Sequence, residues 1–260
     1  MARRPDDLFT TIRTEGGLLP PDLLARIVAS DSRLEGLTPE AYHLVGGQRL
    51  NEAVNRSWTQ LLGAWSDFRT RLAERPASDQ ATGLVRDRWL LPLFAELGYG
   101  RLQPVQGGVV AGGKRFALSH LWQRAPIHLV GARVDLDRRT PGVAGAARTS
   151  PHGLVQELLN ASDDYLWGFV SNGFRLRLLR DSARLTRQAY VELDLEAMLD
   201  GEVYSDFVVL WLLAHQSRVE LREDAPALEP GGGESGDGDG DGEADDAAPP
   251  AAPSPADCWL

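Results

Sequence analysis

The chain has 260 residues, of which 43% are hydrophobic, so it is long enough to bury a substantial core. Its formal net charge is −10, but eleven of the 37 Asp and Glu residues lie in 223–260, which contain no Lys or Arg. The rest of the chain is nearly neutral, and its charge does not exclude nucleic acid as a partner. The one cysteine, Cys258, excludes an internal disulfide. Since no secretion signal or long apolar run is present, we expect a cytoplasmic protein without membrane contact.

Apolar residues at helical spacing mark the first part of the chain. They predict helices over residues 21–30, 50–72 and 81–97, the last kinked by Pro92 and ended by Gly98. We assign residues 1–80 to an N-terminal helical segment. In the longest predicted helix the inward-facing positions are Val54, Trp58, Leu61, Leu62, Trp65 and Phe68.

After Gly98 short apolar runs separated by Gly, Pro and Asn replace the helical spacing. Asn172 and Gly173 predict a hairpin turn, because both tolerate a positive φ. We predict an α/β domain over residues 81–222, with α+β as the alternative class. Its predicted strands are 115–122, 126–136, 165–173, 174–181 and 187–194, and its predicted helices are 151–160, 195–201 and 204–216.

Residues 223–260 are rich in Gly, Asp, Pro and Ala, which predicts a disordered acidic linker or tail. Two interpretations stay open: a linker to further sequence beyond Leu260, so that the chain is a fragment, or a true C-terminal tail. Asp237, Asp239 and Asp241 match the opening of a calcium loop, but Ala248 stands where the bidentate Glu is needed. The five histidines are scattered and no cysteine lies near them, so we predict no metal site.

Asp135 and Asp137 are candidate catalytic residues. They stand two apart, so they would share a face if the predicted strand 126–136 continued to Asp137, and such carboxylate pairs hold Mg²⁺ in nucleases. The next residues, Arg138 and Arg139, stay protonated and cannot act as a base. An ion-paired structural role is therefore favoured over catalysis.

A set of basic residues indicates contact with phosphates. Arg175 and Arg177 alternate on the predicted strand 174–181 and should share a face opposite Leu176 and Leu178. A solvated strand face explains the same pattern equally well. The predicted DNA-binding residues are Arg133, Arg138, Arg139, Asn172, Arg175 and Arg177.

Several motifs occur in the order found in one family. Gln156 lies on a predicted helix, and Trp167-Gly168, Ser171-Asn172-Gly173 and Arg180-Asp181 follow it. In this order, over residues 84–219, the chain resembles the N-terminal region of large restriction-modification DNA methylases of the type IIG kind, which include adenine methylases of phage-defence islands.

The resemblance implies a fold similar to the PD-(D/E)xK nuclease core. In that core an Asp on one strand and an E-x-K on the next hold the metal, and a Gln on the following helix assists. Neither strand 114–122 nor strand 126–136 offers these residues, and only Gln156 matches. The resemblance therefore implies a degenerate, non-catalytic scaffold.

The methylation machinery of the family is also missing from these residues. The adenine-specific motif, Asn-Pro-Pro followed by Tyr or Phe, is absent, and so is a glycine-rich S-adenosylmethionine loop. We expect both, and the cofactor itself, in a part beyond Leu260. The parent enzyme would be a site-specific adenine DNA methyltransferase or a restriction enzyme.

We therefore expect a non-catalytic module that contacts DNA or assembles with the methylase domain or with other defence subunits. One alternative is a docking domain that never touches DNA. The other is a Mg²⁺-dependent endonuclease using Asp135, Asp137 and Gln156.

Overall fold

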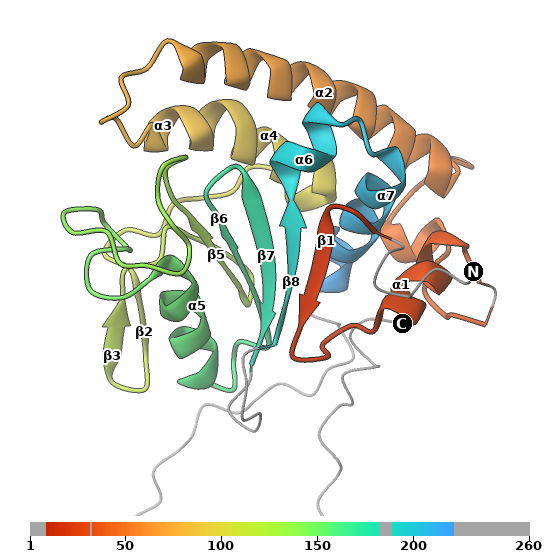
Figure 1. Ribbon diagram of the computed structural model, residues 1–260. Coiled ribbons are helices and arrows are strands. Elements are labelled where there is room, and N and C mark those ends of the chain that lie inside the picture. The colour runs from red at the N-terminus through yellow and green to blue at the C-terminus, as the bar shows by residue number, and fades with distance from the viewer. Residues whose placement is uncertain (1–8, 32, 182–188, 221–260) are drawn as a thin grey trace, which may run out of the picture.

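The computed structural model describes residues 9–31, 33–181 and 189–220. A six-stranded mixed sheet in the order β1-β8-β7-β6-β5-β4 lies between helices (Figure 1). All neighbouring strands are antiparallel except β5 and β6, which α5 connects. A separate hairpin is formed by β2 (Val109–Ala111) and β3 (Lys114–Phe116). The strands of the main sheet are β1 (Ile12–Glu15), β4 (His120–Trp122), β5 (Ala125–Leu129), β6 (Trp167–Ser171), β7 (Arg175–Arg180) and β8 (Tyr190–Asp194).

Helices cover one face of this sheet, with α2 as the outermost layer over α3, α4 and α7 (Figure 1). Val54, Leu61 and Trp65 of α2 share one apolar core with Phe169 and Leu178 of the sheet. This layer consists of α1 (Pro21–Val28), α2 (Leu50–Ala73), α3 (Thr82–Val85), α4 (Leu91–Phe94), α6 (Leu195–Asp200) and α7 (Tyr204–Ala214), with two 3₁₀ turns, Glu40–Tyr42 and Gln216–Arg218.

The opposite face is covered only in part. There α5 (Pro151–Asn160) packs on β5, β6 and β7 through a second apolar core that includes Val155, Val170 and Leu179. The helix begins with Pro151, and the Ser150 hydroxyl accepts a hydrogen bond from the Gly153 amide, a standard N-cap. Over β8, β1 and the part of β7 that carries Arg175 and Arg177, no helix of the described ranges covers this face. Polar side chains are therefore tolerated there.

The predicted α/β class is confirmed, as are the predicted helices at 50–72 and 151–160. The helix predicted at 81–97 runs on through Pro92, with wide π turns at Arg86–Leu90 and Ala95–Tyr99 on either side of α4, and its helical backbone is interrupted at Gly98, whose φ is 88°. Because Pro92 has no amide hydrogen for the preceding turn, a local change of hydrogen-bond register is expected around it.

Two strand predictions were wrong in extent. The predicted strand 115–122 is divided between β3 and β4, which belong to different sheets. The predicted strand 126–136 ends at Leu129, because the chain turns at Gly131, where an added Cβ would lie 2.2 Å from the Gln80 carbonyl oxygen. Asp135 and Asp137 therefore lie in a loop and not on a strand. The short strands β1 and β2 were not predicted.

The predicted hairpin turn joins β6 to β7. Gly173 takes the positive φ of 90°, and Asn172 does not. The Asn172 side-chain oxygen accepts from the amides of Phe174 and Arg175 at 3.1 and 2.9 Å. The Trp89 indole donates to the Gly173 carbonyl at 2.7 Å, so the helical layer holds this turn.

Residues assigned above to the segment 1–80 contribute β1 to the sheet and α2 to its main core. The predicted disordered tail, 223–260, lies outside the described residues, as does the start of the predicted strand 187–194. No helix in the described ranges has the length and apolar character needed to span a bilayer.

The close packing of Gly173 gives a stability prediction. An added Cβ would lie 2.7 Å from Val85 Cγ1, in a backbone conformation that disfavours L-residues. Gly113 also has a positive φ, 72°, but has open space around it, so Gly113→Ala isolates the cost of the backbone. In urea unfolding we expect Gly113→Ala to cost about 1 kcal/mol and Gly173→Ala at least about 2 kcal/mol. Equal losses would mean that the turn is not packed as described.

Candidate functional site

A polar cleft of about 660 Å³ occupies the uncovered part of the sheet face. Its floor is formed by β1, β8 and β7, and the loop 132–137 forms one wall. Arginines and carboxylates line it in equal number, four of each: Arg13, Arg133, Arg175 and Arg177 with Glu15, Asp135, Asp137 and Glu192. Ala132, Val134, Leu136, Asn172 and Tyr190 complete the lining.

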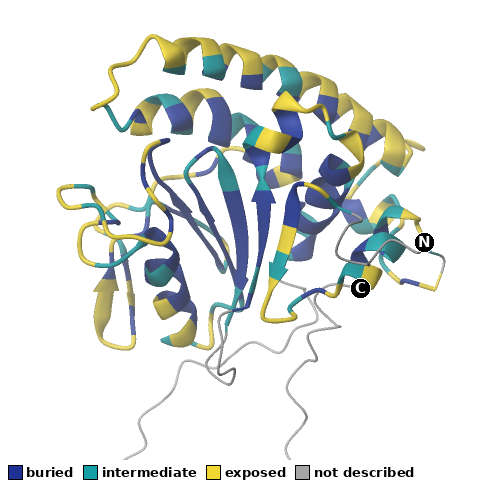
Figure 2. Cartoon of the chain, viewed as in Figure 1, coloured by how far each residue is buried: buried dark blue, intermediate teal, exposed yellow. Residues whose placement is uncertain are grey.

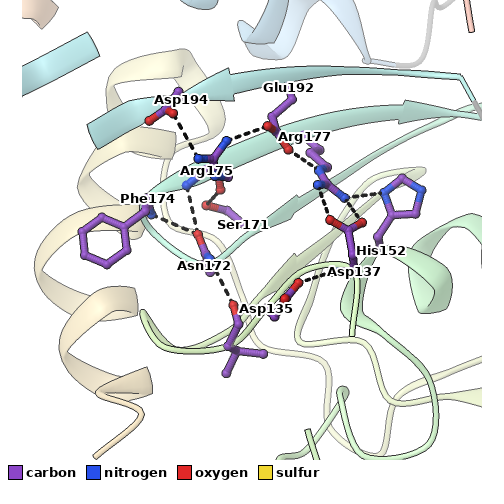
Figure 3. Close-up of polar contacts among 11 residues, drawn as sticks. Asp135, Asp137, His152, Ser171, Asn172, Phe174, Arg175, Arg177, Glu192 and Asp194 are labelled. Atoms are coloured by element: carbon purple, nitrogen blue, oxygen red, sulfur yellow. Dashed lines mark hydrogen bonds and ion pairs between the residues drawn. The ribbon is translucent and has the colours of Figure 1, made fainter. Parts of the chain in front are cut away.

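Arg177 is at the centre of the polar network in this cleft (Figure 3). Its side chain is only 5% exposed, and its Nη1 and Nη2 donate to the two carboxylate oxygens of Asp137 at 2.6 and 2.7 Å. Its Nε donates to Glu192, itself 8% exposed, at 2.6 Å. The pair with Asp137 fastens the loop after β5 to the sheet. Tyr190 packs against the guanidinium, 4.8 Å from the ring centre.

The charges in this network stabilise one another. Burial alone would lower the pKa of Arg177, but its hydrogen bonds to Asp137 and Glu192 outweigh that effect and raise it. The hydrogen bonds from Arg177 hold the pKa of Asp137 below its usual value. Both groups therefore stay charged at neutral pH.

His152, in the first turn of α5, completes the network. Its Nδ1 lies 3.2 Å from Arg177 Nη1, which can only donate, so Nδ1 accepts and the neutral ring carries its proton on Nε2. Burial, reinforced by the charge of Arg177, lowers the pKa of His152 to about 4. His152 is therefore neutral at physiological pH.

Arg175 lies on the same face of β7 as Arg177, as predicted, but is 40% exposed. It pairs with Glu192 at 2.7 Å and with Asp194 at 3.2 Å, which leaves part of its guanidinium at the solvent boundary. Asn172, another predicted DNA-binding residue, uses its amide group within the fold, because its Nδ2 donates to the Val134 carbonyl at 3.0 Å.

The remaining predicted basic residues lie in or beside the loop wall. Arg133 donates to the carbonyl oxygens of Arg75, Pro76 and Asp79, so it ties this loop to the segment that follows α2. Arg138 is 85% exposed and 3.8 Å from Asp135, and Arg139 is exposed. We refer to Arg13, Arg138, Arg139 and Arg175 as the arginine rim, since these cleft and loop cations are accessible to solvent.

The three candidate nuclease residues do not form a metal site. Asp137 gives both oxygens to Arg177, and Asp135 accepts from the Asp137 amide at 2.8 Å. Gln156 donates to the Asn160 side chain and to the Arg180 carbonyl, both at 3.0 Å. No hydrogen bond within the described residues joins it to either aspartate, and no group of three His, Cys, Asp or Glu side chains there fits a metal ion. The residues present therefore do not fit a catalytic Mg²⁺.

Three important residues of the cleft were not singled out in the sequence. Arg13 lies on the unpredicted strand β1, directly opposite Glu192 in the sheet register. Glu192 alternates with buried Val191 and Leu193, which is a signal for the polar face of a strand. His152 carried no such signal, because its partner Arg177 is 25 residues away.

Comparisons with protein-family models, with curated proteins and with solved structures found no match to this chain.

The central role of Arg177 gives a second stability prediction. Arg177→Met should lower the free energy of unfolding in urea by about 3 kcal/mol. The substitution leaves the buried Glu192 without its ion pair to Arg177, and it also removes the ion pair that holds Asp137. Arg175→Met removes the same charge from a side chain that is 40% exposed and should cost about 1 kcal/mol or less. If the two variants unfold alike, the network does not hold the loop.

His152 gives a pH prediction. An imidazole with its pKa lowered from 6.5 to about 4 binds a proton more readily in the unfolded chain, so it costs stability as the pH falls below about 6.5. Between pH 7 and pH 5 this contribution is on the order of 1–2 kcal/mol. The His152→Gln variant should therefore lose less unfolding free energy between pH 7 and pH 5 than the parent chain does, by about that amount. If His152→Gln loses as much unfolding free energy between pH 7 and pH 5 as the parent chain does, the imidazole is not buried as described.

Proposed function

We propose that this chain is a DNA-contacting or assembly module of a restriction-modification or phage-defence DNA methylase, and that it performs no methyl transfer itself. The observation that carries the DNA contact is the arginine rim. Arg13 and Arg175 line the cleft on the part of the sheet that no described helix covers, and the exposed Arg138 and Arg139 directly follow Asp137 of its wall. Guanidinium groups at such positions pair well with phosphate oxygens.

The arginine rim is the DNA-contacting part of the proposal, and Arg177 is its support. Arg177 is buried among two carboxylates and a histidine, so its donors are already used. It serves the proposed contact indirectly, by fastening the loop that carries Arg138 and Arg139. Asn172 likewise orients the turn that precedes Arg175.

We further propose that the fold is a degenerate relative of the PD-(D/E)xK nuclease core. The parallel pair β5 and β6, connected by α5 and flanked by antiparallel strands, is compatible with that ancestry. The engagement of Asp137 by Arg177, in place of a metal, supports a non-catalytic scaffold. S-adenosylmethionine and methyl transfer would belong to a methylase part in the same cytoplasmic assembly.

A specific observation favours the assembly role as a second candidate. The cleft contains as many carboxylates as arginines, whereas DNA-binding surfaces are strongly positive. Alternating charges of both signs suit a protein surface with complementary charges, such as that of the methylase domain or another defence subunit.

Binding to random duplex DNA separates the two roles. The triple variant Arg138→Ala/Arg139→Ala/Arg175→Ala should weaken binding at least about tenfold at low salt and reduce the slope of log affinity against log salt by about 2–3. The control, Arg56→Ala/Arg71→Ala/Arg88→Ala, makes the same change of charge in the helical layer on the other side of the sheet and should leave affinity nearly unchanged. Fluorescence anisotropy measures both. Equal weakening by the two triples, or no binding by the parent chain, would refute DNA contact through the arginine rim and leave the assembly role.

A further inference from the structure

The strand β1 forms one edge of the six-stranded sheet, and no strand of the described residues pairs with its outer side. The Asp194 amide donates to the Thr11 carbonyl at 2.8 Å, which sets the phase of the antiparallel ladder. Thr11, Arg13 and Glu15 therefore direct backbone groups toward β8, and Ile12 and Thr14 direct theirs outward. No backbone hydrogen bond from a described residue reaches Ile12 or Thr14 on that outer side.

A groove of about 230 Å³ runs beside this edge. Its far wall is the start of α1, where Pro21 and Leu24 face the strand, and Phe9 lies in the same groove. The groove thus combines unpaired backbone donors and acceptors with an apolar wall. Since α1 stands next to the edge, the space suits one extended segment better than the edge of another whole sheet.

We propose that β1 is a docking edge for an extended segment of a partner protein, which adds to the sheet as a seventh strand between β1 and α1. Main-chain hydrogen bonds to Ile12 and Thr14 would supply the binding, as in other cases of strand addition. Unprotected strand edges are a known aggregation hazard, so an open edge with a matching apolar wall favours a specific use.

The side chains of β1 define the partner's chemistry. Arg13 and Glu15 are exposed on the cleft face of the strand and carry opposite charges. In an antiparallel addition, a partner carboxylate would lie opposite Arg13 and a partner ammonium opposite Glu15. The two remaining partner residues would lie opposite Thr14 and Ile12. Their side chains would point toward the apolar wall, which favours β-branched apolar residues. The expected segment therefore alternates Lys, Val, Glu and Val from its N-terminus.

The test uses the whole chain and a capped probe peptide, acetyl-Ser-Lys-Val-Glu-Val-Ser-amide. In amide NMR spectra of the free chain, the amides of Ile12 and Thr14 should exchange with solvent faster than those of Arg13 and Glu15. Addition of the peptide should slow that exchange and shift the Ile12 and Thr14 signals.

Two control peptides test the hydrogen bonds and the charges. A peptide N-methylated at both valines lacks the two donors that face β1 and should bind at least about tenfold more weakly. In a third peptide Lys and Glu are exchanged, so that like charges lie opposite Arg13 and Glu15. Its affinity should be at least about threefold lower than that of the original peptide.

Two chain variants complete the test. Thr14→Pro removes the outward amide of Thr14 and should abolish peptide binding, while Thr14→Val keeps it and should bind as the parent does. Circular dichroism checks that both are folded. If Thr14→Pro does not fold, the N-methylated peptide decides alone. Equal affinity of the parent and N-methylated peptides, or no peptide-induced protection of Ile12 and Thr14 at millimolar peptide, would overturn the proposal.

Discussion

A buried guanidinium group is stable only with carboxylates around it, and the arrangement of the cleft depends on the carboxylates that pair with Arg177. Its partners come from three places far apart in the chain: Asp137 in a loop, His152 in a helix and Glu192 on the neighbouring strand. Removing any one of them leaves charge or hydrogen-bonding capacity unmatched in a region of low solvent access. The loop after β5 therefore has one favourable position over the sheet, and the exposed arginines that follow Asp137 in the chain are positioned with it.

The unequal cover of the sheet explains why polar residues line this part of its face. Each strand over this region alternates between a side facing the helical layer and a side facing the cleft. Val191 and Leu193 are buried on the first side, and Tyr190 and Glu192 line the cleft on the second. Figure 2 shows the central strands of the sheet mostly buried and the edge strand β1 partly exposed. Where α5 covers the same face, as at Leu179, the inward residues are apolar. The boundary of α5 is thus also the boundary between core and candidate binding surface.

The sequence predicted elements whose signal is local and missed those that depend on distant partners. The spacing of Trp58, Leu61 and Trp65 identified α2, and the alternation of Arg175 with Leu176 and Arg177 identified the two faces of β7. By contrast, β1 is four residues long and becomes a strand only because β8 pairs with it. The apolar run after Leu129 predicts more strand than exists, since close packing of Gly131 against Gln80 diverts the chain. That Asp137 binds Arg177 also lay beyond local reasoning, because 40 residues separate them.

The indole of Trp89 reaches across from the helical layer to the carbonyl of Gly173, while Asn172 in the same turn holds the loop wall through Val134. The helical layer, the sheet and the loop wall thus all contact the turn between β6 and β7. A shift of the helix that carries Trp89 would move this turn, and with it both the strand bearing Arg175 and the loop opposite. The packing of the outer helices and the geometry of the cleft on the far side of the sheet are therefore linked through this turn.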